Sequence, residues 1–282
     1  MEFIRTLDVK FEVGDAVRLV VESRSGTVAV RSDDSSTVRV EVVARLWAED
    51  DHEADDQAEL IRRGIQHEGD KVSVRAPSLL RPRPFLIFAS RGPRIDYQIT
   101  VPRGTEARVE SRSGRVEVES IRGPLTIESR SGRVAVREIG GNVSIISRSG
   151  TVEAESIGGS LDVETRSGTT RVKGCAGDAT IQARSGALQI EDVGGKLKTG
   201  TRSGSVRYEG GVHGSFDIDV TSGSVRLSVD PDSRFFLDAE AISGSVTSDL
   251  HLRSDGDGGR PPKDAPKVRI RTVSGSIHIA TN

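Results

Sequence analysis

The sequence predicts an all-β fold, a single-chain β-solenoid with 18-residue coils and two strands per coil, after an irregular β region at the N-terminus. Three observations predict this fold. The tripeptide Arg-Ser-Gly recurs with its glycines 18 residues apart, at Gly114, Gly132, Gly150, Gly168, Gly186 and Gly204. A second glycine lies nine residues after each of the first five, at Gly123, Gly141, Gly159, Gly177 and Gly195. Between the glycines, apolar and polar residues alternate, as in strands with one buried face.

One repeat, from Arg130 to Ser147, shows how a coil is built. Val134 and Val136, and then Val143 and Ile145, alternate with other residues and predict two short strands. A glycine corner follows each strand, because glycine accepts positive φ without steric cost. Successive coils are expected to stack at ~4.8 Å, the spacing of hydrogen-bonded strands.

The inward positions of successive coils form columns, which predict the core. The columns are Val116, Val134, Val152, Thr170 and Leu188; Val118, Val136, Ala154, Val172 and Ile190; Leu125, Val143, Leu161, Ala179 and Leu197; and Ile127, Ile145, Val163, Ile181 and Thr199. Cys175 falls in a fifth column, with Ile121, Ile139, Ile157 and Val193. We therefore interpret Cys175 as a small buried residue and not as a reactive thiol.

The domain organisation predicted is an N-terminal β region over residues 1–105, which is expected to cap the solenoid, and a repeat array over residues 106–282. The array carries a loop insertion at 254–267, where Asp-Gly-Asp-Gly-Gly and Pro-Pro occur. Arg24-Ser25-Gly26 stands apart as an early copy of the repeat signal. Alternation predicts strands in the first region at Phe3–Val13, Val17–Glu22, Thr27–Arg31, Thr37–Leu46, Val72–Val74 and Ile95–Val101, and apolar spacing suggests a short helix at Ala54–Ile65. The proline-rich stretch Ala76–Phe88 is expected to cap the open end, with an exposed contact loop as the alternative.

Composition excludes several classes of function. The 282 residues have a net charge of −2 with 29% charged residues, which argues against a nucleic-acid partner because such proteins need a net basic surface. One cysteine excludes an intrachain disulfide and a cysteine-based metal site, and the five histidines show no metal-ligand spacing. No metal and no cofactor is therefore expected. No apolar run is long enough to span a membrane, and no export signal is visible, so the default expectation is a cytoplasmic protein.

The pattern resembles a bacterial family of "putative adhesins" with a β-strand-repeat domain of unknown function. The matching features are the segment Leu19–Gly26, the Val101-Pro102 step before the array, the serial Ser-Gly strands, and the closing segment Val273–Ile279. The resemblance implies a β-solenoid with an irregular N-terminal β region and brings no catalytic residues. Relatives often carry export signals or membrane anchors, so the resemblance also implies a place in the cell envelope.

Tests for catalytic and metal-binding motifs were negative. Calcium-binding nonapeptide rolls need Gly-Gly-x-Gly-x-Asp, whereas the half-repeat Gly140–Ile145 has valine and isoleucine at the last two required positions. The outward carboxylates form repeating columns and no singular pair, although a catalytic pair needs a singular geometry; these are Glu117, Glu119, Glu128, Glu153, Glu155 and Glu164. We therefore predict that the protein is not an enzyme.

The arginine of each repeat is the one residue with chemical character that the turn does not require. Alternation places the six arginines outward along ~24 Å of one corner; they are Arg112, Arg130, Arg148, Arg166, Arg184 and Arg202. They are interpreted either as solvated residues paired with nearby carboxylates, or as a ladder that binds an acidic polymer or an acidic protein surface.

Three functions follow from these expectations. The first is a structural, adhesin-like module that binds a partner through its long faces. The second is an intracellular scaffold that assembles into homo-oligomers by edge or end stacking, and the third, least favoured, is a carbohydrate-active β-helix enzyme. The serines beside the arginines, such as Ser129, Ser131, Ser147 and Ser149, are expected to point inward and form hydroxyl ladders.

Overall fold

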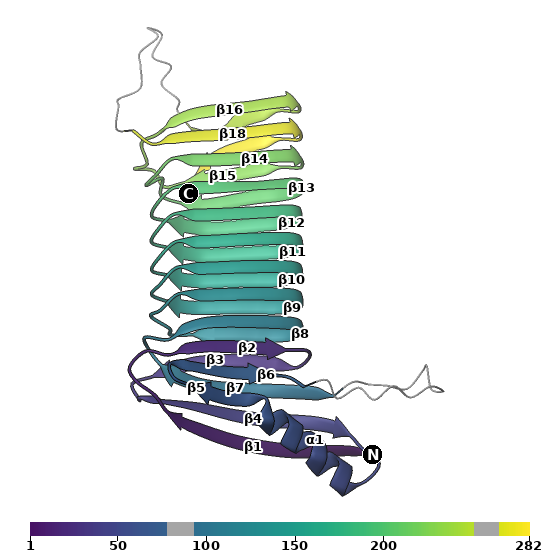
Figure 1. Ribbon diagram of the computed structural model, residues 1–282. Coiled ribbons are helices and arrows are strands. Elements are labelled where there is room, and N and C mark those ends of the chain that lie inside the picture. Colours follow the sequence, from purple (N-terminus) through teal and green to yellow (C-terminus); the bar gives the residue numbers. More distant parts are fainter. Residues whose placement is uncertain (78–92, 251–264) are drawn as a thin grey trace. The chain divides into compact units, whose positions relative to one another are not determined.

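The computed structural model describes residues 1–77, 93–250 and 265–282. The chain divides into two compact units, Met1–Gly140 and Gly141–Asn282, and each consists mainly of stacked strands (Figure 1). The domain division predicted between residues 105 and 106 stays a prediction.

The regular coils of the second unit confirm the predicted solenoid. Each coil is one long strand: β10 (Val143–Ile157), β11 (Leu161–Cys175), β12 (Ala179–Val193) and β13 (Leu197–Gly210). Neighbours pair in parallel with an 18-residue offset, as Val143 does with Leu161. The two short strands predicted for each coil are therefore two halves of one strand, which bends at Arg-Ser-Gly while its ladder continues through the corner.

The predicted columns lie in the cores of both units. Every residue of the five columns is buried, with exposed fractions of 2% or less. Thr170 and Thr199 are buried with the apolar members, and their hydroxyls have no hydrogen-bond partner among the described residues. Cys175 is also buried, as predicted, and this burial raises the pKa of its thiol.

The Arg-Ser-Gly corner needs glycine for two reasons. Gly168 has a φ of 128°, a conformation that strains other residues. The coils are also in close contact here, since a Cβ on Gly168 would lie 1.8 Å from the carbonyl oxygen of Gly150. The serine of the tripeptide joins the coils as well, because the Ser167 hydroxyl donates to the carbonyl oxygen of Arg148 (3.4 Å).

The opposite corner differs from the prediction. Gly159, Gly177 and Gly195 do not have positive φ; the left-handed residue lies three positions earlier and also repeats every 18 residues, at Ser120, Glu138, Ser156, Gly174, Asp192 and Gly210. The predicted glycines are needed for space instead, since a Cβ on Gly177 would lie 2.7 Å from the carbonyl oxygen of Gly159. Close stacking, which a single repeat does not reveal, explains these glycines.

This corner gives a first prediction. Ser156 has a φ of 57°, and left-handed backbone costs a non-glycine residue about 1 kcal/mol. Ser156→Gly is therefore expected to raise the free energy of unfolding by about 1 kcal/mol, as measured by urea denaturation. Ser144→Gly, in the regular part of β10, is the matched control and should lower it by about 0.5–1 kcal/mol. A loss of stability in Ser156→Gly would contradict the assignment of strain to this position.

The first unit contains a coil that lies before the predicted repeat array in the sequence. β2 (Arg18–Ser23) and β3 (Thr27–Asp33) flank Arg24-Ser25-Gly26 and pair in parallel with the two halves of β8 (Glu106–Glu119). β9 (Leu125–Ile139) pairs with the other side of β8. The early copy of the repeat is therefore not isolated, because the chain leaves the stack after this coil and returns to it at β8.

Strands from residues 2–12, 37–77 and 93–102 continue the first unit from the other side of this coil. β6 (Lys71–Arg75) pairs with β2, and β7 (Arg94–Pro102) pairs with β3, both in parallel. β4 (Thr37–Trp47) and β1 (Glu2–Glu12) then follow β7 in antiparallel pairing, and β5 (Ile65–Glu68) pairs antiparallel with β6. All six strands predicted in the first 105 residues are present. Most of the predicted cap Ala76–Phe88 lies outside the described residues.

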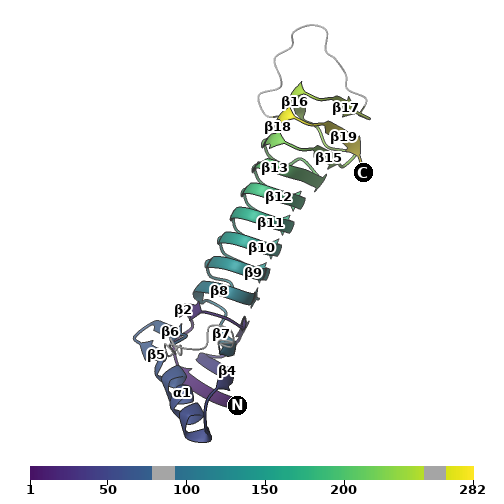
Figure 2. The same ribbon diagram turned by 90° about the vertical axis from the view of Figure 1, so that its right-hand side faces the viewer.

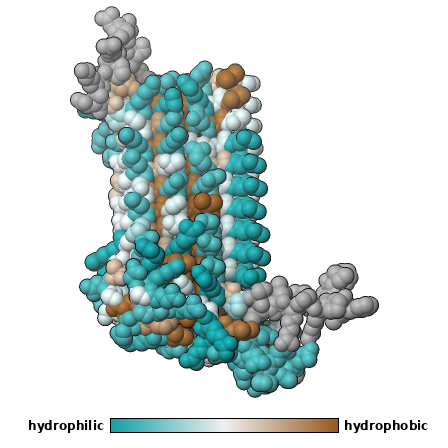
Figure 3. All heavy atoms as spheres, viewed as in Figure 1, coloured by the Kyte–Doolittle hydropathy of each residue, from teal (hydrophilic) through white to brown (hydrophobic). Residues whose placement is uncertain are grey.

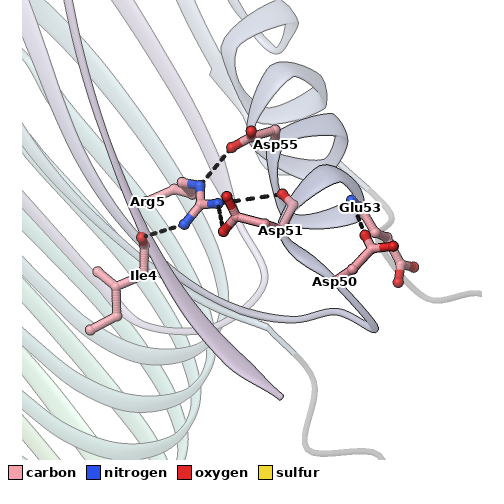
Figure 4. Close-up of polar contacts among 6 residues, drawn as sticks. All are labelled: Ile4, Arg5, Asp50, Asp51, Glu53 and Asp55. Carbon is pink, nitrogen blue, oxygen red and sulfur yellow. Dashed lines mark hydrogen bonds and ion pairs between the residues drawn. The ribbon is translucent and has the colours of Figure 1, made fainter.

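The predicted helix is α1 (Asp51–Arg63), which ends before Ile65 because Ile65 begins β5. Its N-terminus is capped by the Asp50 carboxylate, which accepts from the Glu53 backbone N–H at 2.8 Å. Arg5 of β1 forms ion pairs with Asp51 (2.6 Å) and Asp55 (2.7 Å), as Figure 4 shows. Together with buried Ala54, Ala58 and Ile61, these contacts hold the helix on the first unit.

The end of the second unit reverses the order of the chain. β14 (Phe216–Ser222) and β15 (Val225–Val229) pair with β13, and the next coil in space is β18 (Lys267–Ser274) and β19 (Ile277–Thr281). β16 (Phe236–Ser243) and β17 (Val246–Ser248) lie beyond it, although they precede it in the sequence (Figures 1 and 2). The C-terminal strand β19 is therefore not an open edge, since it is paired on both sides. The predicted loop 254–267 lies largely outside the described residues, and Lys267 already belongs to β18.

Charge explains this order of coils. The outward residues are acidic on β14 and β16 and basic on β18, so that β18 alternates with its neighbours. Arg269 forms a two-pronged contact with Asp217 (2.9 and 2.7 Å) and holds the pKa of that carboxyl below its usual range. On the other side of β18, Arg271 pairs with Glu240 at 3.7 Å. With β16 directly on β14, two rows of carboxylates would instead stack at ~4.8 Å and repel one another.

Candidate functional site

The six predicted ladder arginines all lie at the corner where the coil strands bend, and all are exposed. Arg112 and Arg130 belong to the first unit, and Arg148, Arg166, Arg184 and Arg202 to the second. In the second unit, strand register places the four residues in one column, because each serine that follows pairs with the serine of the next coil. At about 4.8 Å per coil the column of four is about 14 Å long.

The corner arginines have no salt bridge. Across the described parts of the chain, none of the six guanidinium groups forms a hydrogen bond or an ion pair. Two arginines on the flat faces of the coils are paired: Arg108 lies 2.7 Å from Glu128, and Arg171 lies 3.6 Å from Glu153. The sequence left open whether the corner arginines are paired with carboxylates, and their geometry favours the unpaired alternative.

The surroundings of the column in the second unit are nearly uncharged. Two residues before the arginines lie Ile146, Glu164, Gln182 and Gly200, and three residues after them lie Thr151, Thr169, Ala187 and Ser205. Glu164 is the single carboxylate at these eight positions. Figure 3 shows hydrophilic side chains stacked along this edge of β10–β13. Four positive charges at a regular spacing therefore face solvent, with Glu164 the one carboxylate at the flanking positions.

The backbone beneath the column is held by the serines of the repeat. Ser185 donates to the carbonyl oxygen of Arg166 (3.3 Å), and Ser149 and Ser167 lie with their hydroxyl oxygens 3.4 Å apart. The predicted hydroxyl ladder is present only in part: Ser113, Ser131, Ser167 and Ser185 donate to carbonyl oxygens of the preceding coil, and among the described serines that follow the arginines only Ser149 and Ser167 form a hydroxyl pair. The serine before the arginine behaves differently, since the buried Ser111 hydroxyl has no partner in the described parts of the chain.

At the end of the second unit, the arginines of the column are replaced by a threonine and two apolar residues. Strand pairing places Thr221, then Val273, then Ile242 in the positions that follow Arg202. Val273 is 48% exposed and Ile242 is 74% exposed. Figure 3 shows the hydrophobic side chains at this end, beside the tips of β16 and β18. This apolar end could have been found in the sequence, since Ile242-Ser243-Gly244 and Val273-Ser274-Gly275 carry the Ser-Gly signal of the corner with an apolar residue in place of arginine.

The outward carboxylates considered for catalysis take part mostly in ion pairs. Glu119 lies 3.2 Å from both Arg31 and Arg137, and Glu117 lies 3.4 Å from Arg115. Within residues 1–77, 93–250 and 265–282, no group of three or more His, Cys, Asp or Glu side chains could hold a metal ion. In the same ranges, no helix has both the length and the apolar character needed to cross a membrane.

Comparison with known proteins gives a family and two distant structural likenesses. The family model Toastrack DUF4097 matches residues 16–280. A "putative cell adhesion protein" from Clostridium sporogenes is 10% identical with a TM-score of 0.31, over 100% of both chains. A "putative adhesin" from Bacteroides fragilis is 12% identical with a TM-score of 0.42, over 99% of this chain and 97% of its own. No curated protein matches the chain.

Proposed function

The chain belongs to the Toastrack DUF4097 family, and on that premise we propose that it is a non-enzymatic, adhesin-like binding module whose corner arginines bind a linear polyanion. The observation that carries the proposal is that none of these six guanidinium groups forms an ion pair with the described residues, whereas Arg108 and Arg171 on the faces of the coils do. An unpaired guanidinium retains all five N–H donors for a ligand.

The regular spacing favours a polymer over a small anion. Four guanidinium groups at steps of about 4.8 Å can bind successive anionic groups of one extended chain. Each contact is weak when exposed to water, but the contacts act together once the first is formed, so a polymer gains by multivalency. The ligand class is therefore a phosphate- or carboxylate-bearing polymer, of the kind present in cell envelopes, where we propose that the module acts.

The test is a charge-neutralising variant of the second unit. Arg148, Arg166, Arg184 and Arg202 are replaced together by glutamine, and binding of linear polyphosphate and of polyglutamate is measured by fluorescence anisotropy at 50 and 200 mM salt. Loss of four charge-assisted contacts is expected to weaken binding roughly 100-fold at the lower salt, which corresponds to about 3 kcal/mol. The salt dependence of binding should decrease with it, because fewer counterions are released.

The matched control removes the same charge elsewhere in the unit. Lys173, Lys196, Lys198 and Arg207 are exposed cations away from the corner, and their replacement by glutamine changes the net charge equally. The control variant is expected to bind within about 3-fold of the parent protein, since a localised site depends on position. Equal weakening in both variants would show that net charge, and not the corner column, controls binding.

A further inference from the structure

Among the described residues, no strand pairs with one side of the coil made of β16 and β17. β16 pairs with β18, and β17 pairs with β19; no other strand within the described residues pairs with either. Phe236 donates its N–H to the carbonyl oxygen of Pro266 at 2.9 Å, toward β18. Because alternate residues of a parallel strand bond to the same neighbour, the N–H and C=O groups of Leu237 and Ala239 point to the uncovered side.

The exposed fractions along one inward column show that the last coil lacks a covering strand. Val206, Val225 and Ile277 occupy equivalent positions in successive coils and are 1% exposed or less, whereas Val246 at the end of the column is 43% exposed. On β16, Leu237 and Ala239 are partly exposed, although the residues that pair with them on β18 are buried. The last coil therefore presents an apolar row that a further strand would cover.

The charges on this coil specify what kind of strand fits. One outward column reads Lys198, Asp217, Arg269 and Asp238 through successive strands, so its sign alternates at every step. A second column reads Asp219, Arg271 and Glu240 and alternates in the same way. Both columns end on a carboxylate, and the next position in each calls for a cation. A second copy docked through its own β16 would place acidic residues against acidic residues, which disfavours self-pairing.

We propose that the uncovered side of β16 binds an extended segment of another protein as an added parallel strand, with Lys or Arg beside Asp238 and Glu240 and apolar residues beside Leu237 and Ala239. This binding mode is strand addition, in which main-chain hydrogen bonds contribute affinity and alternate side chains contribute specificity. β18 is the chain's own example of such a strand, because Lys-Val-Arg-Ile-Arg-Thr-Val (267–273) pairs with β16 from the opposite side. The exposed Ile242 extends the site, since it lies beside Val273 at the corner.

The probe is a labelled peptide with the sequence of residues 267–273, and its binding to the full chain is followed by fluorescence anisotropy. A peptide with Glu in place of Lys and both Arg should bind at least 10-fold more weakly. Asp238→Asn with Glu240→Gln should weaken the basic peptide about 10-fold, because two charge pairs are lost. Asp162→Asn with Glu191→Gln removes the same charge from exposed positions elsewhere in the unit and should leave binding within 2-fold.

Ala239→Pro tests the hydrogen-bonding edge itself. Proline removes the N–H that points outward and is tolerated at strand edges, so pairing with β18 should persist while peptide affinity falls at least 10-fold. Should this variant fold poorly, amide exchange in the parent protein provides the same information. Peptide is then expected to slow exchange at Leu237 and Ala239 more than at Asp238, whose N–H already faces β18.

Three results would overturn the proposal: an unchanged affinity in folded Ala239→Pro, unchanged exchange at Leu237 and Ala239, or equal weakening in both pairs of charge-neutralising substitutions. Sedimentation velocity of the chain alone tests whether a second copy of the chain occupies this edge instead. Dimers that Ala239→Pro abolishes would assign the edge to a second copy and would also overturn the proposal. None of these results affects the proposed polyanion site, which lies on different residues.

Discussion

Gly168→Ala is expected to destabilise the unit Gly141–Asn282 by at least about 4 kcal/mol, a loss large enough to threaten folding at 25 °C. Two costs add at this residue. Left-handed backbone, with φ at 128°, costs alanine about 1–2 kcal/mol. The larger cost comes from contact, because the added Cβ would lie 1.8 Å from the carbonyl oxygen of Gly150, which belongs to the backbone of the neighbouring coil.

Relief of this clash requires the coils to separate at the corner. A Cβ built on Gly186 would likewise lie 1.8 Å from the carbonyl oxygen of Gly168, so displacement of one coil also disturbs the next. Side-chain repacking cannot remove the clash, since both partners are main-chain atoms. The corner hydrogen bonds, such as the one from Ser185 to Arg166, should weaken with the ladder.

The control separates conformation from contact. Gly69 has a φ of 60°, and nothing lies within 4 Å of a Cβ built on it. Gly69→Ala should therefore cost only the conformational part, about 1 kcal/mol. The measurement is urea denaturation followed by circular dichroism for both variants. Similar losses in the two would contradict the role of close coil contact.

Ile181→Ala is expected to lower the free energy of unfolding by about 3 kcal/mol, the second largest effect. Ile181 is fully buried, and the coils on both sides are held by continuous strand pairing, so that the cavity left by alanine cannot collapse easily. Truncation of a buried isoleucine costs 2–5 kcal/mol, and a rigid site lies in the middle or upper part of that range.

Thr199 occupies the next position of the same column and should respond in the opposite direction. Its side chain is 1% exposed, and its hydroxyl has no partner within the described ranges. Thr199→Val keeps the shape and removes the unsatisfied group, so a gain of about 1–2 kcal/mol is expected. Denaturation of both variants tests the column as a unit. A stability loss in Thr199→Val would mean that its hydroxyl is in fact satisfied.

The regular coils could be predicted from sequence because stacking in this fold is local and repetitive. Each inward residue contacts its equivalents 18 positions away, so the columns that include Ile145 and Val172 follow from alignment of the repeats alone. The glycines at 168 and 177 were also predicted, but both were assigned the same role. Close coil contact explains Gly177, and this contact exists only once the coils are stacked.

The position of the corner arginines could be predicted from the sequence, but whether they form ion pairs could not. Period-two alternation placed Arg148 and Arg166 outward, and their exposure agrees with that prediction. Whether a neighbouring carboxylate reaches them depends on side chains from adjacent coils. Polar alternation does not specify those contacts; in the structure Arg171 is paired, and Arg166 has no partner among the described residues.

The repeat of 18 residues, its corner glycines and its buried columns can all be read from the amino-acid sequence, because each depends on a period that the chain itself carries. The order of the coils could not be read in this way. β18 lies between β14 and β16, and the early coil of β2 and β3 joins the stack at β8, because strand pairing satisfies backbone and charge between segments that are distant in the chain. That order places the basic strand between two acidic ones, and it leaves β16, not the C-terminal strand β19, as the uncovered edge.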